Sequence, residues 1–400
     1  MTQISKKMLA AVASVAFAVP ALAWDFSASG SSDATFKQTS VAYPTGDGTS
    51  SFNTTSSAGG ITIKSSNTDG GHSATFSYTA DWNGDDGNFD EYVKVSGSKK
   101  VGNWTASSST TQHIQKDVTG ADDQAPMTSA GSAVITLTDG SMTYKLGDAS
   151  HLSTAEKTSN GPMSGYVDAE ARVDSFEGFS VGMGVGPGTL TVALDLEAGT
   201  SDTAFGDQSI ALACGGGSSG FGFNFAGNVG ADISVTYATA SSTASSRTCT
   251  SADNTSDSAA AANTMGLGVS IPVGGMTIAI DFESSHVEAT TGGGSITAYT
   301  IGSDKTGFEV MVKMGLGDAE AGINISSQTV TPTTDLSGAT ANNASSTAGT
   351  EVWYEVPIGA VTLAAGYGSA AVTTGGNTAS GTSDTTTTTT EVGAKMSMSF

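Results

Sequence analysis

The chain has 400 residues, of which 52 are glycine and only 8 are proline, and its formal charge is −23. Such acidity excludes a nucleic-acid partner, because nucleic acids are bound by basic surfaces. A mean hydropathy of −0.04 is far too polar for a bundle of membrane helices. The charge instead suits a surface or a passage that attracts cations.

Residues 1–23 have the pattern of a secretory signal peptide. Lys6 and Lys7 precede an apolar stretch that ends in the small-residue motif Ala21-Leu22-Ala23. This stretch is short for a membrane helix, which needs about 20 apolar residues. We therefore expect a cleaved signal and a mature chain of residues 24–400 beginning at Trp24. No later segment is apolar and long enough to form a membrane helix, so a membrane-spanning form would have to be a closed β-barrel.

An acidic run near residue 85 is dense in oxygen ligands of the kind that bind calcium. Asp86 stands where the calcium loop of an EF-hand requires glycine, so the run departs from that motif. A structural calcium ion is one prediction and a solvated acidic loop is the other. No further cofactor is expected. The candidate ligands are Asp81, Asn83, Asp85, Asp86, Asp90 and Glu91.

Apolar residues then recur at every second position in segment after segment, which is the period of a β-strand with one apolar face. The apolar residues are mostly large, and the positions between them are small, polar or charged. Mid-strand acids such as Asp195, Asp281 and Glu309 favour a transmembrane barrel over the alternative of a soluble β-sandwich. Clear examples are Phe221, Phe223 and Phe225; Met276, Ile278, Ile280 and Phe282; and Phe308, Val310, Val312 and Met314.

The connections between these segments alternate between short and long. Tight-turn residues such as Asp139-Gly140 and Gly317-Asp318 alternate with long tracts rich in Ser, Thr and Gly. This pattern predicts an antiparallel transmembrane barrel with short periplasmic turns and long extracellular loops. Cys214 and Cys249 fall in or beside such loops, and in an oxidising compartment they are candidates for a disulfide, the alternative being two free thiols.

The last nine residues alternate without a break and end on Phe400. A closing strand with a terminal Phe resembles that of Gram-negative outer-membrane barrels, in which this residue is part of the signal for the barrel-assembly machinery. Residues 132–148, SAVITLTDGSMTYKLGD, likewise resemble the strand-turn-strand of general porins that leads into an inward-folded third loop. The chain is therefore similar to the general porin family, although the family's arginine cluster is not matched, because Arg172 and Arg247 are its only arginines.

The resemblance implies a barrel of sixteen strands, in which residues 82–130 form a long second loop and residues 148–177 the constriction loop. Tyr92 to Trp104 can form a hairpin of its own, so eighteen strands is the alternative. The resemblance also implies a homotrimer embedded in outer-membrane lipid and lipopolysaccharide.

The polar alternation predicts which side chains line the lumen, and acids outnumber bases among them. The predicted function is a water-filled, cation-preferring channel for passive diffusion of ions and small hydrophilic solutes. The alternative is a surface structural protein or adhesin. The four histidines are scattered and show no catalytic motif, so we expect no enzyme activity. The predicted pore-lining or constriction residues are Asp148, Glu156, Lys157, Asp168, Glu170, Arg172, Asp174, Lys64, Lys145, Asp195, Asp281, Glu309, Lys313 and Lys395.

Overall fold

The computed structural model describes residues 24–55, 59–83, 88–116, 125–126, 133–159, 161, 176–196, 217–243, 259–289, 303–332, 344–375 and 383–400. The predicted signal peptide, residues 1–23, lies outside these residues. Among the described residues, no helix is long and apolar enough to cross a membrane.

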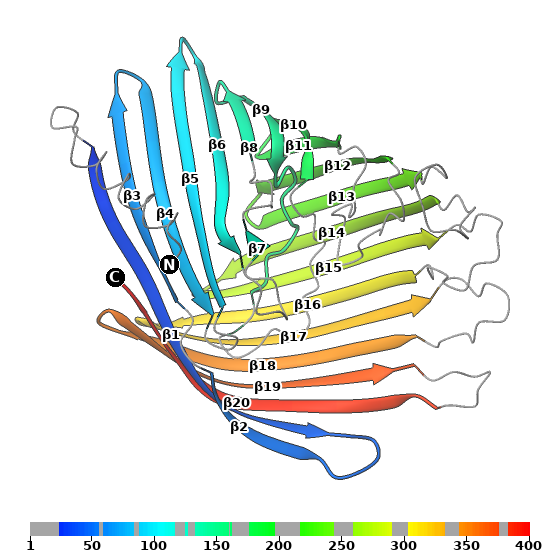
Figure 1. The fold of residues 1–400 in the computed structure, drawn as a ribbon. Coiled ribbons are helices and arrows are strands. Elements are labelled where there is room, and N and C mark those ends of the chain that lie inside the picture. Colours follow the sequence, from blue (N-terminus) through cyan, green and yellow to red (C-terminus); the bar gives the residue numbers. More distant parts are fainter. Residues whose placement is uncertain are drawn as a thin grey trace.

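The described residues form one antiparallel sheet (Figure 1). Its strands are β1 (Asp25–Ala42), β2 (Thr49–Thr55), β3 (Gly59–Asp69), β4 (His72–Asn83), β5 (Asn88–Val101), β6 (Trp104–Lys116), β7 (Ala125–Pro126), β8 (Ala133–Thr138), β9 (Met142–Ala149), β10 (Phe176–Val185), β11 (Gly188–Asp195), β12 (Gly217–Asn228), β13 (Asp232–Thr243), β14 (Ala259–Val273), β15 (Met276–Ala289), β16 (Ser303–Leu316), β17 (Ala319–Pro332), β18 (Ser345–Ile358), β19 (Val361–Thr374) and β20 (Thr385–Ser399).

The sheet closes on itself, because β20 pairs with β1 along Ser31 to Ala42. The first half of β1 pairs with β3 and the second half with β2, so β2 and β3 follow one another along the same edge and count as one barrel strand. The two-residue strand β7 pairs only with the end of β6. The described strands thus make a closed barrel of eighteen strands with one small extra strand.

The expectation of sixteen strands is therefore wrong, and the alternative of eighteen is correct. The difference lies in residues 82–130, predicted as a long second loop, which contain the paired strands β5 and β6. Their outward faces include small or polar residues such as Gly97, Ser108 and Thr110, so the apolar alternation that marks the other strands is weak here.

The pattern of burial is the reverse of that in a soluble protein. Large apolar side chains such as Phe308, which is 47% exposed, point away from the barrel, whereas Asp281 and Glu309 are each 1% exposed and point inward. Since neighbouring residues of a strand face opposite sides, the outward apolar face and the inward polar face follow from the same alternation. In a lipid bilayer, a closed sheet satisfies every backbone hydrogen bond, and an apolar outer belt places apolar side chains against the lipid.

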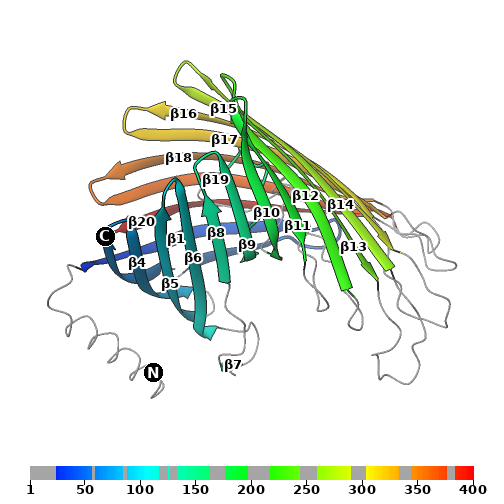
Figure 2. The ribbon, with the colours of Figure 1, turned by 90° about the horizontal axis from the view of Figure 1, so that it is seen from above.

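The two ends of the barrel differ, as the sequence predicted. Eight connections, from β3–β4 to β18–β19, have two or three residues, and the connections at the other end are longer (Figure 2). In the β8–β9 turn, Asp139 Oδ1 accepts hydrogen bonds from the backbone N–H groups of Ser141 and Met142, at 2.9 and 2.8 Å. Gly140 adopts a φ of 92°, which favours glycine. Local hydrogen bonding therefore fixes this hairpin.

Candidate functional site

Residues 150–159 and Gly161, here called the inner segment, follow β9 and lie against the inner wall of the barrel. The carbonyl of Ser153 accepts hydrogen bonds from Asn224 Nδ2 of β12, at 3.3 Å, and from Thr236 Oγ1 of β13, at 2.8 Å. Ala155 lies against Gly268 of β14, where any side chain would collide with its backbone. The segment therefore contacts successive strands along one side of the lumen.

Two carboxylates of the wall hold the far half of the inner segment through its backbone. Asp281 of β15 accepts hydrogen bonds from the N–H groups of Lys157, at 2.8 Å, and Thr158, at 2.6 Å, and from the Thr158 hydroxyl at 2.5 Å. Glu351 of β18 accepts one from the Gly161 N–H at 2.9 Å. Because buried carboxylates need such donors, these acids anchor the segment rather than stand free in the lumen.

A small apolar cluster supports the same part of the segment. Ala279, Met311 and Trp353 project inward from β15, β16 and β18 and are buried. The Ser159 hydroxyl contacts Met311 Sδ at 3.3 Å. The Trp353 ring lies over Gly322 of β17, where a side chain would displace it. Apolar packing and charged hydrogen bonds together fix the segment on this side.

His151 anchors the start of the inner segment. It is buried, and its ring nitrogens contact the Ser180 hydroxyl at 3.0 Å and the Gly147 carbonyl at 2.8 Å. Burial, with a contribution from the charge of Lys145, lowers the pKa of His151, although the contact to Gly147 opposes this. The ring is therefore neutral at pH 7, with Nε2 donating to the Gly147 carbonyl and Nδ1 accepting from Ser180.

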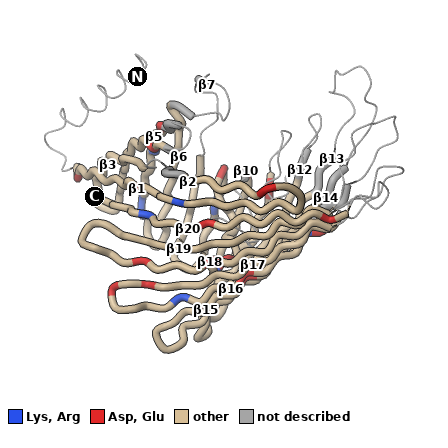
Figure 3. Tube along the Cα trace, turned by 90° about the horizontal axis from the view of Figure 1, so that it is seen from below, with Lys and Arg blue, Asp and Glu red and all other residues tan. Residues whose placement is uncertain are grey.

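The inward lysines fall into two groups, and Figure 3 shows where basic and acidic residues lie along the strands. Each lysine of the first group forms an ion pair with a carboxylate. The pairs are Lys37 with Glu391 at 3.1 Å, Lys305 with Glu283 at 2.9 Å, Lys313 with Glu320 at 3.0 Å and Lys395 with Asp33 at 2.8 Å.

The second group consists of Lys64 on β3, Lys94 on β5 and Lys145 on β9. Each shares the inward alternation of its strand, opposite outward residues such as Ile61, Val95 and Leu146. None of the three has a carboxylate partner among the described residues. These three lysines therefore bring to the lumen positive charge that no described carboxylate pairs, and Lys145 does so beside the inner segment, whose Ser150 carbonyl accepts a hydrogen bond from its ammonium at 3.0 Å.

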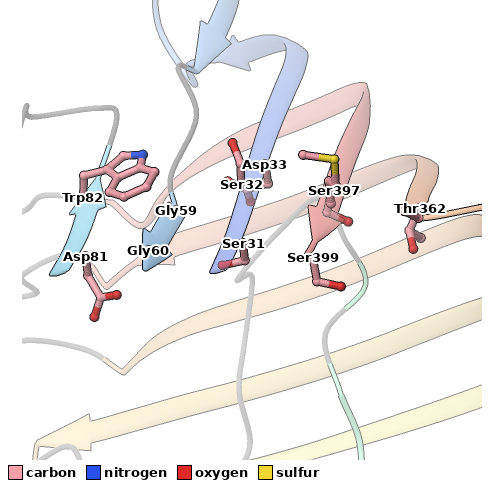
Figure 4. Close-up of a pocket in the computed structure, with 12 residues that line it drawn as sticks. Ser31, Ser32, Asp33, Gly59, Gly60, Asp81, Trp82, Thr362, Ser397 and Ser399 are labelled. Carbon is pink, nitrogen blue, oxygen red and sulfur yellow. The ribbon is translucent and has the colours of Figure 1, made fainter. Parts of the chain in front are cut away.

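A recess of about 450 Å³ lies near the middle of β1, where its pairing partner changes from β3 to β2. Figure 4 shows Asp33 of β1 and Ser397 of β20 on neighbouring strands, and the Trp82 ring beside Gly59. A side chain at Gly59 would meet that ring at 2.8 Å. The ion pair between Asp33 and Lys395 joins β1 to β20 beside this recess.

The structure brings several of the predicted lumen residues to the inner face. Lys64, Lys145, Asp195, Asp281, Glu309, Lys313 and Lys395 all lie on inward alternations. Glu309 accepts a hydrogen bond from the Asn324 amide. Asp148 is different: it belongs to β9, pairs with Glu177 and shares the outward alternation of Leu146. It therefore stands at the rim, because β9 extends further than the predicted loop boundary.

Part of the predicted constriction loop, residues 150–159 and 161, is described and follows the β8–β9 hairpin, but the loop is not the third in order. Since β5 and β6 add a hairpin, the connection between β9 and β10 is the fourth, rather than the third, at the long-loop end. Glu156 and Lys157 belong to the inner segment. Asp168, Glu170, Arg172 and Asp174 lie outside the described residues, as do Cys214 and Cys249.

The predicted calcium ligands do not all converge. Asp81 pairs with Asp90, whereas Glu91 pairs with Ala80, so Asp81 and Glu91 lie on opposite alternations. Glu91 instead accepts a hydrogen bond from the Tyr78 hydroxyl at 2.5 Å. The side chains of Asn83, Asp85, Asp86 and Asp90 lie outside the described part of the chain, within which no group of three or more His, Cys, Asp or Glu could hold a metal.

His286 also has a structural partner. Its Nδ1 contacts Asp304 Oδ1 at 2.5 Å. Within the described ranges, neither Ser284 nor Ser285 contacts the ring, so the residues shown here do not form a serine–histidine pair.

No family model matches the sequence, and no curated protein matches it. Solved structures do align with most of the chain. The anion-selective porin from Comamonas acidovorans aligns over 94% of this chain and 100% of its own, with 13% identity and a TM-score of 0.49. OmpT expressed in the outer membrane of Vibrio cholerae aligns over 95% and 99%, with 9% identity and a TM-score of 0.48. The outer-membrane channel DcaP of Acinetobacter baumannii aligns over 94% and 97%, with 11% identity and a TM-score of 0.48.

The first of these neighbours is a porin, the second an outer-membrane protein and the third an outer-membrane channel. At such identities and TM-scores, the fold and the function of this chain rest on its own strand pairing and lumen.

Several important residues could not be predicted from the sequence. Lys37, Lys94 and Lys305 face the lumen, but the outward positions close to each include small or polar residues, as Asp304 and Thr306 do beside Lys305 at the start of β16. Asn224 and Thr236 show no sequence signal for binding the inner segment, because that role depends on a backbone about 70 to 80 residues away.

Proposed function

We propose that this protein is an outer-membrane pore through which ions and small hydrophilic solutes diffuse passively. The observation that carries the proposal is the inverted barrel, whose outer face is apolar and whose inner face bears charges and hydroxyl groups. A polar interior of this kind favours water rather than a packed apolar core. The outer membrane is the setting proposed for it, since barrels of this type are found there.

The inner segment supports a constriction that narrows the lumen without sealing it. Its contacts with the wall follow the strands in order from β10 through β12, β13, β15 and β16 to β18. A segment held flat against one side leaves the other side to solutes. We therefore place the passage between the inner segment and the wall that carries Lys64 and Lys94.

A mild cation preference is the finer part of the proposal. It is supported by the formal charge of −23, since an acidic protein concentrates cations near its entrances. The structure limits its size, because Asp281 and Glu351 are occupied by backbone N–H groups and other acids are paired with lysine.

Planar-bilayer recording tests both parts. The purified protein should give stepwise conductance in KCl, and under a KCl gradient its reversal potential should have the sign of cation preference. An absence of conductance would exclude the pore and leave the predicted adhesin as the alternative. An anion-selective reversal potential would exclude only the cation preference.

A homotrimer is a further part of the proposal. The exposed outward face of β6 carries Ala106, Ser108, Thr110 and Gln112, which are poorly suited to lipid. Contact with a second copy would cover these polar groups. The detergent-solubilised protein should have the mass of a trimer by light scattering, and a monomeric mass would contradict this part.

A further inference from the structure

A second recess, of about 410 Å³, lies on the inner face of β9, β10 and β11. It extends from the β8–β9 turn to the beginning of the inner segment. The residues relevant to its chemistry are Thr143, Lys145, Ser180, Gly184, Thr189 and Thr191. Most are hydroxyl-bearing, and none of the described residues that line the recess is an acid.

Glycine creates the hollow. Gly184 faces inward from β10, and a side chain built there would meet no atom within 4 Å. Gly182, the next inward residue on the same strand, is also open, with its nearest contact at 3.4 Å from Thr191. Side chains fill the corresponding positions on β9 and β11, so the barrel wall is indented along β10.

Among the described residues that line this indentation, only Lys145 is charged. Its Nζ donates a hydrogen bond to the Ser150 carbonyl at 3.0 Å. An ammonium group has three donors, so two remain, and no carboxylate neutralises its charge among the described residues. The nearby Asp139 carboxylate is turned into its own hairpin, where it accepts hydrogen bonds from Ser141 and Met142.

His151 keeps the upper end of the recess in shape. Because it is neutral and accepts from the Ser180 hydroxyl, it adds no charge of its own and fixes that hydroxyl in place. Lysine and surrounding hydroxyls are the donors that bind carboxylate and phosphate oxygens. The described part of its lining includes no Trp, Tyr or Phe of the kind that stacks on a sugar ring.

From this geometry we infer that the β9–β11 recess is a binding site for a small oxyanion, held by the Lys145 ammonium and neighbouring threonine hydroxyls in the hollow at Gly184. The inference rests on the proposed pore, since the recess opens to the lumen. It refines the proposed function, because a pore whose overall charge favours cations would still bind oxyanions at one point along its passage. Inorganic phosphate is the probe, and carboxylates of similar size share its chemistry.

The experiment measures single-channel current in KCl while potassium phosphate is added at constant ionic strength, with KBr as the matched non-oxyanion salt. Phosphate should reduce the current in a saturable manner, and bromide should not. The variant K145Q should raise the half-blocking phosphate concentration by about 30-fold, the loss expected for one charge-assisted hydrogen bond. The control is K395Q, because Lys395 also faces the lumen but is paired with Asp33. Phosphate should block this variant at the same concentration as the native protein.

A second pair of variants separates binding in the recess from a general effect of charge. G184L fills the hollow without changing any charge, and its phosphate block should disappear. G315L is the matched control, because Gly315 also faces open space but lies on β16, away from the recess.

Block that persists in G184L, or is absent in the native protein, would overturn the site while leaving the pore intact. If KCl conductance itself is absent, the proposed pore fails. Calorimetric titration of the solubilised protein with phosphate then tests the site alone, since saturable heat lost in G184L supports it and no heat refutes it.

Discussion

Asp281 should control the position of the inner segment. In D281N the side chain keeps its size but loses its charge, and its amide N–H₂ faces backbone donors in place of an oxygen. The native carboxylate accepts from Lys157 N, Thr158 N and the Thr158 hydroxyl at 2.5–2.8 Å. Losing one such charge-assisted bond costs about 2 kcal/mol. That cost corresponds to a roughly 30-fold increase in the detached population.

Hydrogen exchange measured by mass spectrometry provides the assay. The amides of Lys157 and Thr158 should exchange about 30-fold faster in D281N, because detachment exposes them to water. Single-channel recordings should show added current noise as the segment moves. E320Q is the control, since Glu320 is an inward acid that is paired with Lys313 rather than with the described residues of the segment. Unchanged exchange in D281N would refute the reasoning.

Three further predictions concern closure, the β8–β9 turn and calcium. G30V should slow barrel closure, because a side chain at Gly30 would meet the Phe400 ring at 2.6 Å and the Gly60 carbonyl at 2.9 Å. The strain is about 1–3 kcal/mol. On gels run without boiling, G30V should give a smaller fraction of the closed, heat-modifiable barrel than the control A28V, and equal fractions would contradict the prediction. Hydrogen bonds from Met142 and Ser141 hold the pKa of Asp139 below its usual value, so its stabilising effect is complete above the unfolded pKa and is lost as pH falls through the folded pKa. In D139N, the free energy of unfolding measured with urea should no longer fall in this acidic range as it does in the native protein. The same dependence on pH in both proteins would contradict the prediction. Calorimetry with calcium decides between the two predictions for the acidic run: saturable heat in the native protein that is lost in D85N would support a bound ion, and no heat in the native protein would support a solvated loop.

The sequence by itself determined the class of fold and the two faces of its strands. The alternation through residues such as Phe308, Glu309 and Val310 requires a sheet with one apolar and one polar face, whatever its partners. It also predicted the tight turn at Asp139-Gly140, because turn chemistry is local. The outward faces of β5 and β6 give a weaker signal, which is why the sequence predicts sixteen strands, with eighteen as the alternative, although the barrel has eighteen.

Only the tertiary structure decided what the lumen residues do. Asp281 and Lys145 are equivalent in the sequence, as charged residues on polar alternations. In the barrel, Asp281 meets the backbone of a segment more than a hundred residues away, whereas Lys145 faces a hollow without an acid. The physical reason is that alternation fixes the direction of a side chain, but its partner depends on how the strands are ordered around the closed sheet and where the inner segment lies.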